Sequence, residues 1–337
     1  MKRRSFNTIV FLITLSLIFV FFAQAEIFPQ IDAKESFHLG KPVQAGSIAV
    51  IPIESNKAIN PHKYITLAEA VKRGLVEIIE LPGQESVNTL RVRNKARLPL
   101  ILFAGELLLG GKQDRIVAKD TIIPPGETYD VAVFCVEHGR WHGKDVKFSG
   151  GAGYVPQNVR EAAYETASQS EVWAEVDKAN ERAGAAPATK TIQGALNQPK
   201  LKKEVTELAE KLDKAFEKSP NAVGFIVWMN GEIRSAELFA NSALFTANRK
   251  KLLESYAMEA KLNKAKNTKP VDLAKCNAFL RDILSAKRMM ADEDSNSTRW
   301  RIRDGKVIGV EAGSTEYKGG FGAGFGHGTY KPGKGGR

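Results

Sequence analysis

The sequence predicts an α+β protein in which an antiparallel, β-sandwich-like sheet region is covered by several α-helices. Short β-prone runs dominate residues 41–150 and are joined by turns, not by crossover helices. Helical periodicity dominates residues 151–312, where an Asn-Gly and an Asp-Gly turn also indicate two hairpins. With 337 residues and 43% apolar content, the chain is long enough to bury a substantial core.

The first 25 residues have the pattern of a signal peptide. Lys2, Arg3 and Arg4 precede an almost wholly apolar run, and Ala23-Gln24-Ala25 offers the small residues that a signal peptidase reads. We expect cleavage after Ala25 and an exported protein, periplasmic or secreted. The alternative is an uncleaved anchor, for which an apolar run of about 15 residues is short. Without the leader the formal charge falls from +11 to +8, and no later run suits a stable membrane span.

After an extended lead-in at residues 26–40, the β-rich half alternates strands with turns. Leu90 and Val92 alternate with two arginines, as in a half-exposed strand. Thr66-Leu-Ala-Glu69 is a capping box that begins a short helix, which Gly74 ends. The strands are expected at residues 47–53, 75–81, 87–93, 98–103, 115–123 and 129–136.

The second half is helix-rich and completes a single domain over residues 41–312. Pro199 suits the first position of a helix, where a missing amide costs nothing, and Gly184 suits a helix end. Hairpin turns are expected at Asn230-Gly231 and Asp304-Gly305. The helices are expected at residues 158–182, 199–216, 242–264 and 271–290. Residues 313–337 are Gly-rich and basic, which predicts a disordered tail.

Polar residues gather at a predicted turn, Gly110-Gly-Lys-Gln-Asp-Arg115. The run lacks the spacing of a phosphate loop, and no Ser or Thr follows Lys112, so we exclude a nucleoside triphosphatase. The turn presents Gln113, Asp114 and Arg115 as candidate ligand-binding residues. The alternative is a hairpin whose Asp and Arg pair at the surface.

A second polar group follows the strand that ends at Cys135. Glu137, Arg140 and Trp141 offer a carboxylate, a guanidinium and a large ring, which together could grip an anionic or heterocyclic ligand. Alternatively, Trp141 caps the core while the two charged residues tie the turn to a neighbouring strand. Strand alternation places Cys135 in the core, although a nucleophilic role is the other possibility.

Glu106 is a carboxylate between apolar runs, so it must be paired, protonated or at a sheet edge. Our hypothesis is that it pairs with Arg115 or Arg140. A hydrolase needs a general acid and a general base, and Glu106 and Glu137 are the candidate catalytic pair.

Other classes of site find little support in the sequence. Five histidines without supporting acidic residues or a Cys-x-x-Cys pair give no metal site, and we expect no cofactor. No basic stripe is interleaved with aromatic residues, which argues against a nucleic-acid partner. Cys135 and Cys276 are 141 residues apart, and sequence alone leaves a disulfide between them open.

Two segments carry a combination of motifs: the run from Asn94 through Ala104-Gly-Glu-Leu107 to Gly110–Arg115, and Cys135-Val-Glu-His-Gly-Arg-Trp141. Together they resemble the ARG and rhodanese-phosphatase-superfamily-associated protein domain, where ARG abbreviates ADP-ribosylglycohydrolase. The resemblance continues through Val172-Trp173, Glu237-Leu-Phe239 and Ser255-Tyr256, over about residues 45 to 265. It implies a link to ADP-ribose or related nucleotide metabolism. The residues at matching motif positions are Glu106, Gln113, Arg115, Glu137, Arg140 and Trp141.

Together these observations predict an exported protein that binds or slowly hydrolyses an anionic small molecule at a Glu/Arg/Trp cluster. The alternative is a non-enzymatic interaction module of the cell envelope, in which the motif residues hold the sheet together. Whether the protein is an enzyme, and whether it has protein partners, stays open at this point.

Overall fold

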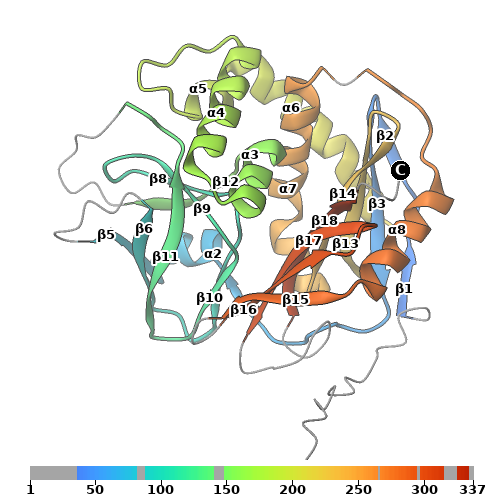
Figure 1. Ribbon diagram of the computed structural model, residues 1–337, viewed down its shortest axis with the longest axis horizontal. Coiled ribbons are helices and arrows are strands. Elements are labelled where there is room, and N and C mark those ends of the chain that lie inside the picture. Colours follow the sequence, from blue (N-terminus) through green and yellow to red (C-terminus); the bar gives the residue numbers. More distant parts are fainter. Residues whose placement is uncertain are drawn as a thin grey trace, which may run out of the picture. The chain divides into compact units, whose positions relative to one another are not determined.

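The computed structural model describes residues 36–81, 88–139, 148–264, 266–293, 297–314 and 325–333. Within these ranges the chain has the predicted α+β fold, with antiparallel sheets and covering helices (Figure 1). Among the helices described, none is both long enough and apolar enough to cross a bilayer. The predicted leader lies outside the described residues.

The largest sheet has nine strands in the part of the chain that is described. All its pairings are antiparallel, and the small strand β2 (Val43–Ala45) joins it by pairing with β3. In spatial order the other strands are β1 (Phe37–Leu39), β3 (Ile48–Ser55), β13 (Ala222–Met229), β14 (Glu232–Phe239), β18 (Phe325–Pro332), β17 (Val307–Ser314), β16 (Ser297–Arg303) and β15 (Arg288–Glu293).

Two smaller sheets come from the β-rich half. The six-stranded sheet is antiparallel and has the order β12 (Ser149–Tyr154), β8 (Glu106–Leu109), β9 (Arg115–Val117), β11 (Thr128–Cys135), β6 (Thr89–Asn94) and β5 (Val76–Glu80). The three-stranded sheet has the order β10 (Thr121–Ile123), β7 (Leu100–Leu102) and β4 (Ile65–Thr66). Its β4–β7 pair is parallel, in contrast to the antiparallel pairing that the short turns predict.

The helices lie mainly in the second half of the chain. They are α2 (Leu67–Lys72), α3 (Gln157–Glu161), α4 (Gln169–Ala183), α5 (Gln193–Leu196), α6 (Pro199–Asp213), α7 (Ser242–Leu262) and α8 (Leu273–Ser285). A π-helical turn at Ala162–Thr166 follows α3, and a 3-10 turn at Lys214–Phe216 follows α6.

Strand β13 is buried along its whole length because helices cover both faces of the large sheet. Phe225 and Val227 pack into the apolar cluster that contains α7. The alternate residues, Ile226 and Trp228, pack into the cluster that contains α8. A third cluster lies between the strands of the two smaller sheets and α2. This double burial explains why β13 is a continuous apolar run rather than an alternating one.

Local signals of the sequence match the structure at turns and caps. The Thr66 hydroxyl accepts a hydrogen bond from the Glu69 amide at 3.3 Å, and Gly74 follows the helix with φ of 66°. Asn230 and Gly231 both have positive φ, as the hairpin turn between β13 and β14 requires. The hairpin at Asp304-Gly305 likewise joins β16 and β17.

Two predicted helices differ from the structure. The helix predicted over residues 158–182 is interrupted, because Ala167 has φ of 49° and the Thr166 hydroxyl donates to the Ala162 carbonyl at 2.7 Å. The helix predicted over residues 271–290 ends at Ser285, and Arg288–Glu293 instead forms β15 against β16. In the second case tertiary pairing overrides a helical pattern.

The expectation of a loose tail was wrong for Phe325–Pro332, which forms β18 between β14 and β17. Its glycines pack closely instead of leaving the strand unsupported. A Cβ on Gly328 would lie 2.3 Å from the Tyr330 hydroxyl, and one on Gly309 of β17 would lie 2.7 Å from the Tyr330 ring. Glycine therefore makes room for the large residues that alternate with it.

Candidate functional site

Four of the predicted site residues come together where the 110–115 turn meets the end of β11. We call Gln113, Asp114, Arg115 and Glu137 the turn cluster. The Asp114 amide donates to Glu137 Oε2 at 3.2 Å, and the Asp114 carboxylate accepts from the Gly110 amide at 3.0 Å. Arg115 Nη1 donates to Gln113 Oε1 at 3.3 Å. The structure therefore brings these two motif segments side by side.

The turn cluster is buried rather than displayed on the surface. Arg115 is only 1% exposed, so the alternative of a surface ion pair between Asp114 and Arg115 was wrong. Cross-links also tie the cluster to the segment before α5: the Thr191 hydroxyl donates to Asp114 at 3.4 Å, and the His138 amide donates to the Thr189 carbonyl at 3.0 Å. These bonds hold the turn and the strand end in one arrangement.

The other two predicted ligand-binding residues, Arg140 and Trp141, lie outside the described residues, which end at Gly139 on this side of the gap. Their relation to the turn cluster is thus a prediction.

A stacked ring pair lies next to the turn cluster. The His138 ring and the Trp173 ring of α4 have centroids 4.2 Å apart and an interplanar angle of 34°. His138 Nε2 and Trp173 Nε1 are both buried without a hydrogen-bond partner among the described residues. Burial lowers the pKa of His138, which favours a neutral ring. Gln113 Nε2 donates to the His138 carbonyl at 3.4 Å, which connects the pair to the turn cluster.

Glu106 does not belong to the turn cluster. Its Oε2 accepts a hydrogen bond from the Phe103 amide at 2.9 Å, and its Oε1 is buried without a partner in the described part of the chain. Neither oxygen bonds Arg115, so the proposed pairing with that residue was wrong. Glu106 instead lies opposite Tyr154 of β12. Burial raises the pKa of Glu106 to about 7, although the Phe103 amide and the charges of Lys251 and Arg160 act against this.

A larger buried cluster, absent from the predicted site, surrounds Glu237 of β14. We call Asp120, Arg160, Glu237, Tyr256, His327 and Thr329 the Glu237 network. Glu237 Oε1 accepts from Arg160 Nη1 at 2.9 Å and from the Tyr256 hydroxyl at 2.6 Å. Its Oε2 accepts from the Thr329 hydroxyl at 2.7 Å and lies 2.9 Å from His327 Nε2. Four donors therefore saturate one carboxylate.

His327 bridges two carboxylates. Its Nδ1 lies 2.6 Å from Asp120 Oδ2, while Asp120 Oδ1 accepts from the Ala104 amide at 2.7 Å. The rings of Phe103 and Phe239 lie 5.1 Å and 4.4 Å from the imidazole, so aromatic side chains exclude water from it.

The charges of the Glu237 network compensate one another. Burial would lower the pKa of His327, but the carboxylates of Asp120 and Glu237 raise it to about 9. Burial would likewise raise the pKa of Glu237, but Arg160 and His327 lower it to about 2. Arg160 and His327 thus face the carboxylates of Asp120 and Glu237, an arrangement that tolerates burial because each charged group has a partner.

The Glu237 network depends on a close approach at Gly105. This residue has φ of 84°, and a Cβ there would lie 2.2 Å from Arg160 Cγ. Arg160 Nε also donates to the Ala104 carbonyl at 3.2 Å, and its guanidinium lies 4.9 Å from the centre of the Tyr154 ring. The Ala104-Gly105-Glu106 motif therefore shapes this network rather than the turn cluster.

Sequence reasoning missed most of the Glu237 network because its members are far apart along the chain. His327 lies 207 residues from Asp120 and 90 from Glu237. One local signal was present: in Phe325-Gly-His-Gly-Thr329, larger residues alternate with glycine at the period of a strand.

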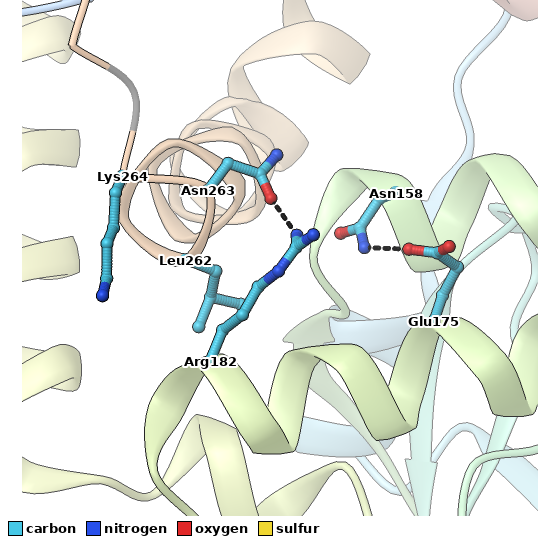
Figure 2. A pocket seen from close by; sticks show the side chains of 6 residues that line it. All are labelled: Asn158, Glu175, Arg182, Leu262, Asn263 and Lys264. Atoms are coloured by element: carbon cyan, nitrogen blue, oxygen red, sulfur yellow. Dashed lines mark hydrogen bonds between the residues drawn. The ribbon is translucent and has the colours of Figure 1, made fainter.

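A polar groove of about 460 Å³ lies apart from both clusters, lined by Asn158, Glu175, Arg182, Leu262, Asn263 and Lys264. Figure 2 shows that its side chains already pair: Arg182 donates to Asn263, and Asn158 donates to Glu175 at 2.5 Å. It contains none of the predicted site residues.

Cys135 and Cys276 are both buried free thiols, so the structure contains no disulfide between them. Burial raises the pKa of Cys135, which disfavours a thiolate nucleophile, and raises the pKa of Cys276 to about 12. Within the described ranges, no group of three or more His, Cys, Asp or Glu residues is arranged to hold a metal ion.

Comparison with known proteins identifies the family. No curated protein and no solved structure matches the chain. The sequence model of one family, the ARG and Rhodanese-Phosphatase-superfamily-associated Protein domain (ARPP-1), matches residues 36–320. This range contains the turn cluster and all of the Glu237 network except His327 and Thr329, and it spans most of the chain. The chain therefore belongs to the ARPP-1 family.

Proposed function

We propose that this ARPP-1 protein is exported and binds an anionic small molecule beside the turn cluster, with Arg140 and Trp141 among the contacts. The observation that carries the proposal is the His138–Trp173 pair, whose buried ring nitrogens lack partners among the described residues. An indole N–H can only donate, and a buried donor without an acceptor is costly. A carboxylate or phosphate oxygen would supply that acceptor.

Binding is a better proposal than hydrolysis. The candidate acid–base pair, Glu106 and Glu137, has hydrogen bonds in two different clusters, one to the Phe103 amide and one to the Asp114 amide. An acid and a base must both reach one substrate, whereas these two carboxylates are held by different segments of the chain. The ligand class implied by the family resemblance is ADP-ribose or a related nucleotide.

A thermal-shift screen against ADP-ribose, nucleotides and sugar phosphates tests the proposal. A ligand at 100 times its dissociation constant adds about 2.7 kcal/mol of apparent stability. A matched pair of variants then identifies the site. Trp173→Phe keeps the ring but removes the unpartnered N–H, and should weaken binding by about 1.5–3 kcal/mol if the ligand is anionic.

The control is Trp228→Phe, because Trp228 Nε1 already donates to the Lys269 carbonyl at 3.2 Å. This variant should lose about 1 kcal/mol of folding stability and no ligand affinity. Equal affinity of Trp173→Phe and the unaltered protein would refute the proposed site.

The second candidate is a cell-envelope interaction module without a small ligand. It is favoured by the backbone bonds of the turn cluster, since Asp114 and Glu137 both accept main-chain amides and so stabilise the fold. A screen without any hit, together with a protein that co-purifies from the envelope, would support this candidate instead.

Export is tested separately by the mass of the mature protein. Cleavage after Ala25 should leave Glu26 at the N-terminus, and the protein should appear in the periplasmic or secreted fraction. A retained leader in the membrane fraction would indicate the uncleaved anchor.

A further inference from the structure

Strand β15 forms one edge of the nine-stranded sheet. It pairs with β16 on one side, and within the described ranges no strand pairs with its other side (Figure 1). An open edge presents unpaired main-chain groups that can accept a further strand. From Arg288 to Met290 the ladder with β16 is regular, and the register shifts only between Met290 and Asp292.

The edge is apolar at its centre. Met289 is 50% exposed and Met290 is 65% exposed, the two highest values among the large apolar side chains that the structure describes as exposed. They are neighbours in an extended strand, so they point to opposite faces of the sheet. A segment lying along β15 would therefore cover a methionine on each face, and flexible methionines adapt well to such contacts.

Basic side chains accompany the first half of this edge, whereas Asp292 and Glu293 occupy its far end, beyond the register shift. Arg301 of β16 lies opposite Met289 on one side and Val310 of β17 on the other, so the three share one face. Arg303 follows two residues later on that face, and Lys287 precedes β15. Lys287, Arg301 and Arg303 have no ion-pair partner among the described residues, unlike Arg299, which pairs with Asp292.

We infer that β15 is a docking edge for an extended acidic segment of a partner protein, which adds as a further strand. The main-chain edge supplies hydrogen bonds, the two methionines supply apolar contact, and Lys287, Arg301 and Arg303 select acidic residues. A second copy of this chain is a poorer occupant, because it adds another positively charged molecule with a formal charge of +8 after loss of the leader. This inference is independent of the ligand site beside the turn cluster.

Fluorescence anisotropy with a short labelled peptide of alternating Glu and Val tests the inference, with a peptide of alternating Lys and Val as the reference. The acidic peptide should bind in preference to the basic one. Met290→Asp should weaken binding of the acidic peptide by about tenfold or more, since it places a like charge on the edge, and Arg301→Gln by severalfold. Leu273→Asp is the matched control, because Leu273 is a 41% exposed apolar residue on α8, outside the edge.

Circular dichroism first confirms that each variant is folded, which these exposed positions should allow. Equal binding of the two peptides, or an effect of Leu273→Asp as large as that of Met290→Asp, would overturn the inference. The inference would also be overturned if the acidic peptide fails to bind and sedimentation instead shows a dimer that Met290→Asp dissociates. Binding to phosphatidylglycerol vesicles in place of the peptide would identify a membrane contact and would equally contradict a protein partner.

Discussion

The bridge that His327 forms between Asp120 and Glu237 makes a quantitative prediction about stability and pH. The pKa of His327 is about 9 in the folded chain and about 6.5 in the unfolded chain, because only folding brings the two carboxylates to the ring. Between these values the folded state binds one more proton than the unfolded state. The contribution of His327 is therefore fully present below pH 6.5 and is lost as pH rises through 9.

The magnitude follows from the size of the pKa difference. Each pH unit in this window should lower the free energy of unfolding by about 1.4 kcal/mol, or about 3 kcal/mol over the whole window. Urea denaturation at closely spaced pH values from 6 to 10 measures this slope. In His327→Gln the slope above pH 7 should disappear, and the free energy of unfolding should already be lower at pH 6, because two carboxylates lose their shared donor.

His38→Gln is the control, because the His38 side chain is 54% exposed and pairs with Glu54 only at 3.8 Å. This variant should retain the slope of the unaltered protein. Where His327→Gln fails to fold, Asp120→Asn removes one of the two carboxylates and should make the slope shallower. An identical slope in the unaltered protein and in a folded His327 or Asp120 variant would refute the reasoning.

Two further predictions concern the Ala104-Gly105-Glu106 motif, and urea denaturation measures both. Gly105→Ala should lower the free energy of unfolding by about 3 kcal/mol or more, because the new Cβ would overlap Arg160. The control is Gly46→Ala, which has φ of 66° and no atom within 4 Å of the new Cβ, and should cost only about 1 kcal/mol of backbone strain. Similar losses in both variants would contradict the overlap. Glu106→Gln should raise the free energy of unfolding above pH 7 by up to about 3 kcal/mol. The reason is that the Glu106 carboxyl, with a pKa of about 7, contributes stability below pH 4.5 that is lost as pH rises through 7. Unchanged stability above pH 7 would show that the ionised carboxylate has a partner.

The sequence predicted the features that depend on near neighbours. The capping of α2 by Thr66 and the hairpin turns at Asn230 and Asp304 rest on a few adjacent residues, whose conformational preferences decide the structure locally. The turn cluster was also predictable, because the 110–115 turn leads into β9 and Glu137 follows β11, and these two strands are neighbours.

The Glu237 network was not predictable in this way. It joins residues from β14, β18, α3, α7 and the segment between β9 and β10, and no single stretch of sequence shows that these elements meet. The interruption of the predicted strand at residues 115–123 illustrates the difficulty. Asp120 lies in that interruption, between β9 and β10, and only the folded structure shows that its carboxylate contacts His327.

The position of β18 affects how the protein can be made. The strand occupies an interior place in the large sheet although it follows every other described strand in sequence, so the sheet is incomplete until β18 has been made. A gene fragment trimmed at residue 320, where the family match ends, would leave β14 and β17 with facing unpaired edges and would delete His327. Such a fragment should aggregate or be degraded.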